Sequence, residues 1–179
     1  MALFRWFNRG NFEYCFIISG FAAKSVHSSQ GGGSEYICLP SEPQWTGDEV
    51  AGHQTNSYIY GVEYWANGLP HILQNPDKHT GVPCSVCETE NQTQLLMIPA
   101  ATSCPVGWMR QYLGNLMAER YNHAGSSNYI CVTQQYEQIS ASVGDQASGY
   151  AIPVEVICGS LPCPPYVEGN ELSCVVCTK

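Results

Sequence analysis

The sequence predicts an all-β, disulfide-rich fold made of two tandem, pseudo-symmetric halves of short antiparallel strands with long loops. Three observations predict it. Short runs of β-branched and aromatic residues alternate with clusters of turn-forming residues. Ten of the 179 residues are cysteine. Landmarks of the first half of the chain recur in the second half in the same order.

The expected strands are short and rich in residues that favour extended backbone. They cover residues 36–39, 58–64, 95–98, 129–132, 151–157 and 174–177. Clusters of glycine, asparagine and serine bound them, as at Asn67-Gly68 and Gly169-Asn170. Many short strands with such turns indicate an all-β fold.

One segment, Gln111–His123, fits either a helix or a strand. Its apolar residues follow helical spacing. Gly114 interrupts that pattern, and the corresponding first-half segment, Phe16–Ala23, looks extended. We therefore favour a strand in both segments.

An internal repeat divides the chain into residues 1–95 and 96–179, which together form one compact domain. GSEYICL at 33–39 recurs as SSNYICV at 126–132, and CSVCET at 84–89 recurs as CVVCTK at 174–179. Cys84 follows Cys38 by 46 positions, and Cys174 follows Cys131 by 43. Gly20 and Gly114 precede the first cysteine of these pairs by 18 and 17 positions. Landmarks in one order at nearly one spacing indicate a tandem duplication.

The repeat organises the cysteines into four plus four plus two. The first frame holds Cys15, Cys38, Cys84 and Cys87, and the second holds Cys104, Cys131, Cys174 and Cys177. The extra cysteines, Cys158 and Cys163, are close enough in sequence to pair with each other. Each four-cysteine frame allows three pairings, and the halves either pair alike or exchange bridges symmetrically. Zinc held by the two CxxC pairs is the lesser alternative.

Composition and charge exclude several functions. Only 12% of residues are charged, about half the usual share. The net charge of −8 repels nucleic acid and anionic lipid. No segment reaches the roughly 20 apolar residues of a membrane helix. Many cysteines in a weakly charged chain indicate a secreted, extracellular protein. Residues 15–23 mimic a signal peptide, but Cys15 matches Cys104 and belongs to the fold.

Candidate ligand residues lie on the predicted loops. His27 and His123 occupy related places in the two halves. With His79 and a carboxylate, they form a candidate site at the join of the halves for a divalent metal or a sugar hydroxyl. Asn91 begins the one N-glycosylation sequon. No nucleophile with an adjacent base is evident, so we expect neither an enzyme nor a cofactor.

Long segments of the chain resemble a known family. They include GGGSEYICLP at 31–40, LMIPAATSCPVGW at 96–108 and CGSLPCPPYVEGNELSCVVCTK at 158–179. These segments are similar to the non-collagenous carboxyl-terminal domain of the short-chain, type IV-like collagens of sponges and other invertebrates. The resemblance implies a secreted matrix protein that assembles, as a trimer, and carries no catalytic residues. The chain departs from the family because it holds no Gly-X-Y run.

The sequence thus predicts a structural or assembly module of the extracellular matrix, a homo-oligomer without its own collagenous stretch. Its possible partners are a matrix protein or a glycan. The alternative is a lectin-like recognition module that binds glycans through its aromatic and histidine-bearing loops.

Overall fold

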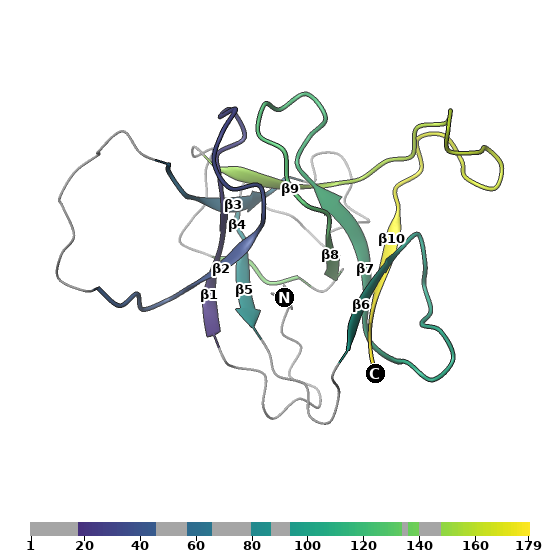
Figure 1. Ribbon diagram of the computed structural model, residues 1–179, viewed down its shortest axis with the longest axis horizontal. Helices are drawn as coiled ribbons and strands as arrows, with labels where there is room; N and C mark the ends of the chain where they lie inside the picture. The colour runs from purple at the N-terminus through teal and green to yellow at the C-terminus, as the bar shows by residue number, and fades with distance from the viewer. Residues whose placement is uncertain (1–17, 46–56, 66–79, 87–93, 134–135, 140–147) are drawn as a thin grey trace.

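Ten strands and no helix make up the regular structure of the described residues in the computed structural model (Figure 1). These residues are 18–45, 57–65, 80–86, 94–133, 136–139 and 148–179. The first five strands are β1 (Ile18–Lys24), β2 (Ile37–Pro40), β3 (Tyr60–Tyr64), β4 (Thr80–Gly81) and β5 (Pro83–Val86). The others are β6 (Leu95–Pro99), β7 (Met109–Ala118), β8 (Ile130–Thr133), β9 (Gly149–Pro153) and β10 (Ser173–Thr178). The all-β prediction is confirmed.

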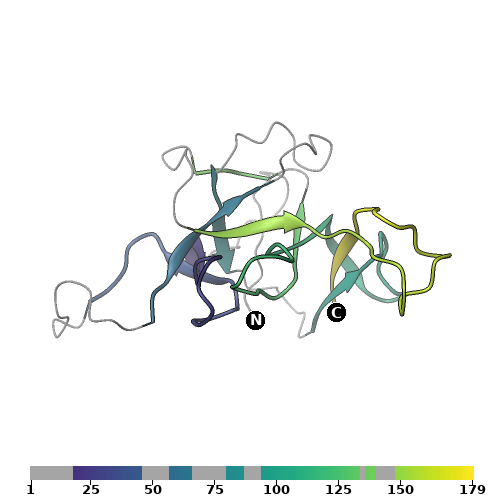
Figure 2. The ribbon, with the colours of Figure 1, turned by 90° about the horizontal axis from the view of Figure 1, so that it is seen from above.

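The strands form one curled, mixed sheet. Its main path runs β2-β1-β3-β9-β7-β10-β6, and β4, β5 and β8 pair with β3, β1 and β7. All these pairings are antiparallel except β3 with β9, which is parallel. In Figure 1, β1, β2 and β5 lie on one side of the molecule and β6, β7 and β10 on the other. Figure 2 shows β9 crossing between the two sides, so the parallel contact joins the two halves of the chain.

Two three-stranded units have the same registers. In the first unit, β1 pairs with β2 and β5, so that Gly20 lies opposite both Pro40 and Cys84. In the second unit, β7 pairs with β8 and β10, so that Gly114 lies opposite both Thr133 and Cys174. Positions that hold the same place in the two units are called matched below. The cysteine partners are matched as well, because Ala22 faces Cys38 where Leu116 faces Cys131.

The match extends to the neighbouring strands. Glu63 on β3 lies opposite Gly81, and Glu155 makes an isolated bridge with Glu171. Gly81 and Glu171 each lie three positions before the first cysteine of a CxxC pair. The amides of Ala22 and Leu116 donate to the carbonyl oxygens of Val82 and Leu172, at 2.9 and 2.8 Å. These are equivalent hydrogen bonds in the two halves.

The two matched glycines allow the strands of each unit to approach closely. A Cβ atom on Gly20 would lie 1.9 Å from the Leu39 carbonyl oxygen, and one on Gly114 would lie 2.2 Å from the Val132 carbonyl oxygen. Leu39 and Val132 are themselves matched. Both contacts are with backbone, which cannot move aside without disturbing the strand pairing. Glycine is therefore required at both places.

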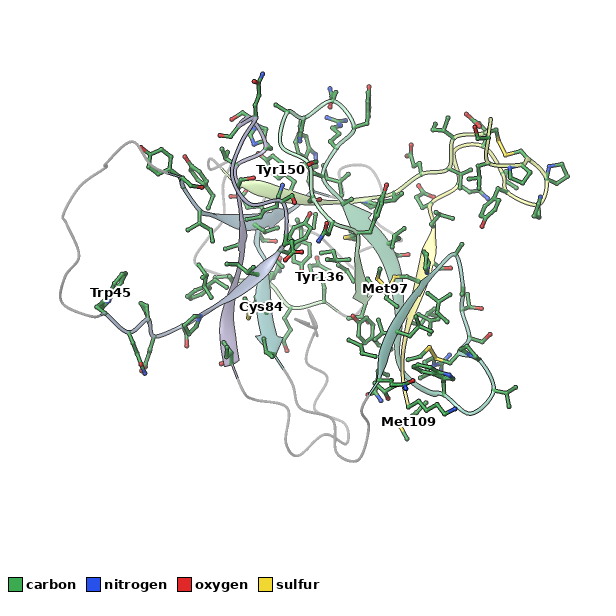
Figure 3. The ribbon with its side chains drawn as sticks, in the orientation of Figure 1. Trp45, Cys84, Met97, Met109, Tyr136 and Tyr150 are labelled. Carbon is green, nitrogen blue, oxygen red and sulfur yellow. A yellow bond between two sulfur atoms is a disulfide. The ribbon has the colours of Figure 1, made fainter. Side chains whose placement is uncertain are left out.

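The larger core lies between the two units. It joins Ala22, Val82 and Cys84 of the first half to Met117 and Val132 of the second. Tyr136 packs against this core and lies between the two groups of strands in Figure 3. A smaller core contains Leu116, Cys131, Cys174 and Val176, with Leu95 and Met97 of β6 packed against it. Each core thus has one matched disulfide at its side.

Four disulfides cross-link the described residues. Cys38 pairs with Cys84, and Cys131 pairs with Cys174. Cys104 pairs with Cys177, and Cys158 pairs with Cys163 as the sequence favours. Each four-cysteine frame therefore joins its second cysteine to its third, a pairing that the sequence left open. Cys15 and Cys87 lie outside the described residues.

Several strand predictions are corrected in detail. Gln111–Ala118 is strand, as favoured, but residues 119–123 lie beyond the end of β7. Only the first part of 151–157 is strand, because β9 ends at Pro153. The sequence missed β4 and β5, whose Gly81, Pro83 and CxxC motif are typical of turns.

The expectation of antiparallel strands is wrong for the pairing of β3 with β9, which is parallel. The division at residue 95 stays a prediction, and it falls within β6.

Candidate functional site

A buried ion pair marks the join of the two halves. Lys24, the last residue of β1, reaches Glu119, the first residue after β7. The Lys24 Nζ lies 2.8 Å from the Glu119 Oε2, and the two side chains are 0% and 2% exposed. A Cβ on Gly149 would lie 2.5 Å from the Lys24 Cγ, so glycine at 149 leaves room for the lysine stem. The pair therefore ties β1 to β7 through the protein interior.

The Glu119 carboxylate is fully hydrogen-bonded. Its Oε2 accepts from the Tyr150 amide at 3.0 Å, and its Oε1 contacts His123 Nδ1 at 2.7 Å. The Arg120 amide donates to the same Oε1 at 3.2 Å. Burial opposes ionisation of Glu119, but the hydrogen bonds from Lys24, the Tyr150 amide and His123 outweigh it and lower its pKa from the ordinary 4.5. Glu119 is thus a charged, fixed acceptor that orients its neighbours.

Tyr36 completes the buried side of this cluster. Its hydroxyl donates to the Tyr150 carbonyl oxygen at 2.6 Å, and the Lys24 Nζ lies 5.8 Å from the centre of its ring. Burial raises the pKa of Tyr36 well above its ordinary value, so the hydroxyl stays protonated. Lys24 is therefore held between a carboxylate and an aromatic face.

The structure brings His27 and His123 together. Their ring centroids are 4.8 Å apart and tilted by 49°. The His27 Nδ1 lies 2.9 Å from the Ser148 carbonyl oxygen, while the His123 Nδ1 faces the Glu119 carboxylate. A carbonyl and a carboxylate only accept, so both Nδ1 atoms carry a proton, and the Nε2 of each ring is the acceptor in the tautomer without a second proton.

Aromatic and cationic side chains pack around the histidines. The Trp65 ring lies edge-to-face with Tyr150, with centroids 4.9 Å apart, and 6.1 Å from His123. The Arg120 Cζ lies 5.1 Å from the centre of the Trp65 ring, within the range of a cation–π contact. Figure 3 labels Tyr150, which lies on β9 where that strand passes between the two sides of the molecule.

A cavity of about 780 Å³ opens beside this cluster. Its lining includes Trp65, Glu119, Arg120, Tyr121, His123 and Tyr129. Ser126 and Glu155 add polar groups, and Ile152, Pro153 and Val154 add an apolar wall. The cavity therefore combines aromatic rings, hydrogen-bonding groups and both signs of charge, and the fixed Glu119 carboxylate is part of its lining.

The predicted ligand residues are only partly gathered here. His27 and His123 meet beside a carboxylate at the join of the halves. His79 and Asn91 lie outside the described residues, so their part in a site stays a prediction. Trp65 lines the cavity, whereas Trp45, another aromatic residue, lies on a loop far from it (Figure 3).

Sequence reasoning missed Lys24 and Glu119. A lysine directly after Ala22-Ala23 at the end of an apolar run was the available signal, since only 12% of the residues are charged. Its partner lies 95 positions away, so no local pattern could identify it.

Metal binding by cysteine finds no support in the described residues. The one described group of three metal-binding side chains is Cys158, Cys163 and Glu168. The two sulfurs form a disulfide, and the Glu168 carboxylate accepts the Cys158 amide hydrogen. Each of the eight described cysteines is disulfide-bonded. The zinc alternative is therefore wrong for these eight.

No protein-family model, no curated protein and no solved structure matches the chain. Among the described residues, no helix is long and apolar enough to span a membrane. The four disulfides fit an oxidising, extracellular environment.

Proposed function

We propose that the chain is a secreted structural module of the extracellular matrix, built from two duplicated halves, that assembles with copies of itself. The matched registers, matched disulfides and matched glycines of the two units support the duplication. The resemblance to the globular domain of short-chain collagens makes a trimer the expected assembly. The four disulfides support secretion.

An exposed apolar sheet face carries this proposal. Side chains alternate across a strand, so Phe21 of β1 shares one face with its opposite neighbours, Leu39 of β2 and Pro83 of β5. Ile37 lies two positions from Leu39 on the same face. These four residues are called the outer face. Phe21 and Ile37 are 44% and 40% exposed, although both lie in paired strands. An apolar sheet face that is exposed to this extent favours association.

The second half shows what covers such a face. Ile130 and Val132 are matched to Ile37 and Leu39, but they are only 8% and 0% exposed. They are buried because the first half packs against them in the larger core. Ile37 and Leu39 thus hold, in the first unit, the places of two residues that bind the other half in the second unit. The other two residues of the outer face, Phe21 and Pro83, are matched to the polar Asn115 and Ser173. A second copy of the chain is therefore the occupant that we propose.

Sedimentation velocity across a range of concentrations tests this proposal. We expect the wild-type chain to form a discrete oligomer. The Ile37→Lys variant should shift to monomer, because association would bury the unpaired lysine charge in an apolar contact. Val106→Lys is the matched control, since Val106 is fully exposed on a loop and its variant should remain oligomeric. Thermal unfolding of each variant checks that the fold is retained. A wild-type chain that stays monomeric near 100 µM, about the concentration at which weak specific contacts form, contradicts the proposal.

Glycan recognition is the second candidate, and the cavity beside Trp65 favours it. Aromatic rings next to hydrogen-bonding groups suit a sugar, which presents both an apolar face and hydroxyl groups. The two functions are compatible, since the cavity and the outer face use different residues.

A further inference from the structure

We propose that the cavity binds a neutral saccharide, and that Glu119 prepares His123 to accept a hydrogen bond from a sugar hydroxyl. This inference rests on the glycan-recognition candidate. It adds the site, the chemical class of the ligand and the role of a buried carboxylate.

The size and lining of the cavity fit one or two sugar rings. A volume of about 780 Å³ lies within the range of small-molecule sites. Tyr121 and Tyr129 line it from the segment between β7 and β8, and they are 95% and 59% exposed. Exposed tyrosine rings present a large apolar surface at a small cost in conformational entropy. A pyranose ring stacks its C–H face on such a surface.

Charge favours a neutral ligand. Lys24 neutralises Glu119 in the interior, and the rim carries one cation, Arg120, and one anion, Glu155. Arg120 is already placed over the Trp65 ring. The whole chain has a net charge of −8, which repels sulfated or sialylated glycans. A neutral sugar is not repelled by the net negative charge and needs no unpaired charge in the cavity.

His123 supplies a directed acceptor. Its Nδ1 hydrogen is committed to Glu119 at 2.7 Å, so the Nε2 is the nitrogen that a ligand in the cavity can use. Glu119 is itself held by Lys24 and the Tyr150 amide, which prevents it from turning toward the ligand. Ser126, also in the lining, offers a hydroxyl that both donates and accepts. Ordered donors and acceptors of this kind discriminate among sugar hydroxyls.

A glycan array followed by titration calorimetry tests the inference, with neutral, sialylated and sulfated oligosaccharides as the probes. We expect the full chain to bind neutral glycans in preference to acidic ones. Tyr129→Ala and His123→Ala should each weaken the best neutral binder at least about tenfold, equivalent to about 1.4 kcal/mol. Tyr58→Ala is the matched control, because Tyr58 is also an exposed tyrosine but does not line the cavity. Its affinity should equal that of the wild type.

The outcomes separate the inference from the broader candidate. Binding of neutral glycans that survives both cavity variants contradicts the site but leaves glycan recognition standing. Selective binding of sulfated or sialylated glycans contradicts the proposed ligand class. An array without any binding contradicts both. The titration is repeated with the Ile37→Lys variant, which we expect to be monomeric, so that glycan affinity is measured without assembly.

Discussion

Replacing Glu119 by glutamine tests the buried ion pair that joins the two halves. Glutamine keeps the shape of the side chain and can still accept a hydrogen bond from the Tyr150 amide, but it removes the charge that faces Lys24. The Lys24 ammonium would remain 0% exposed without its counter-ion. Removing one partner of a buried pair costs about 3–5 kcal/mol of unfolding free energy. For a chain of this length, that is a drop in Tm of about 6–20 °C.

Urea unfolding under non-reducing conditions, followed by tryptophan fluorescence, measures the loss. Glu155→Gln is the matched control, because it neutralises an exposed carboxylate in the same cavity and should change the unfolding free energy by less than about 0.5 kcal/mol. Lys24→Met combined with Glu119→Gln removes both charges and should restore about 2 kcal/mol relative to Glu119→Gln alone. A loss below about 1 kcal/mol for Glu119→Gln would refute the idea that the pair holds the halves together.

Three further predictions follow from the same geometry. Because the pKa of Glu119 is lowered in the folded protein, its contribution to the unfolding free energy is complete above pH 4.5 and is lost as the pH falls through the folded-state pKa. Urea unfolding at a series of pH values should therefore show a steeper loss of unfolding free energy in the wild type than in Glu119→Gln. Gly20→Ala and Gly114→Ala should each cost about 1–3 kcal/mol by calorimetry, whereas Gly61→Ala, with open space at its Cβ, should be neutral or slightly stabilising. Replacing Cys131 and Cys174 by alanine opens a loop of 43 positions and should lower the unfolding free energy in urea by about 4 kcal/mol. The same change at Cys158 and Cys163, whose loop spans 5 positions, should lower it by about 2 kcal/mol. Equal losses would contradict the view that these disulfides stabilise the fold by restricting the unfolded chain.

The fold class was predictable because its signals are local. Short segments such as Tyr129–Val132 carry β-branched and aromatic residues between turns, and the strands form where these occur. The strand outcome for Gln111–Ala118 followed from Gly114, whose close approach to the Val132 carbonyl oxygen explains why it interrupts an otherwise helical pattern. The repeat also indicated which cysteines hold equivalent places, although it left their pairing open.

The candidate site was harder to predict because its contacts are distant in sequence. The sequence suggested that His27 and His123 meet beside a carboxylate, from their related places in the two halves. It could not identify Glu119, since the ion pair with Lys24 depends on how β1 and β7 are brought together. The parallel pairing of β3 with β9 could not be predicted from the sequence either, because it joins strands that are separated by about half of the chain.

Mass mapping of peptides from the unreduced protein tests the two-half construction most directly. The structure keeps every described bridge within one half, and it predicts linked peptides that contain Cys38 with Cys84, Cys131 with Cys174 and Cys104 with Cys177. The repeat then also predicts that Cys15, the match of Cys104, links to Cys87, the match of Cys177. Linkages that cross the halves, such as Cys38 with Cys131, would contradict the pairing within each half on which the account depends.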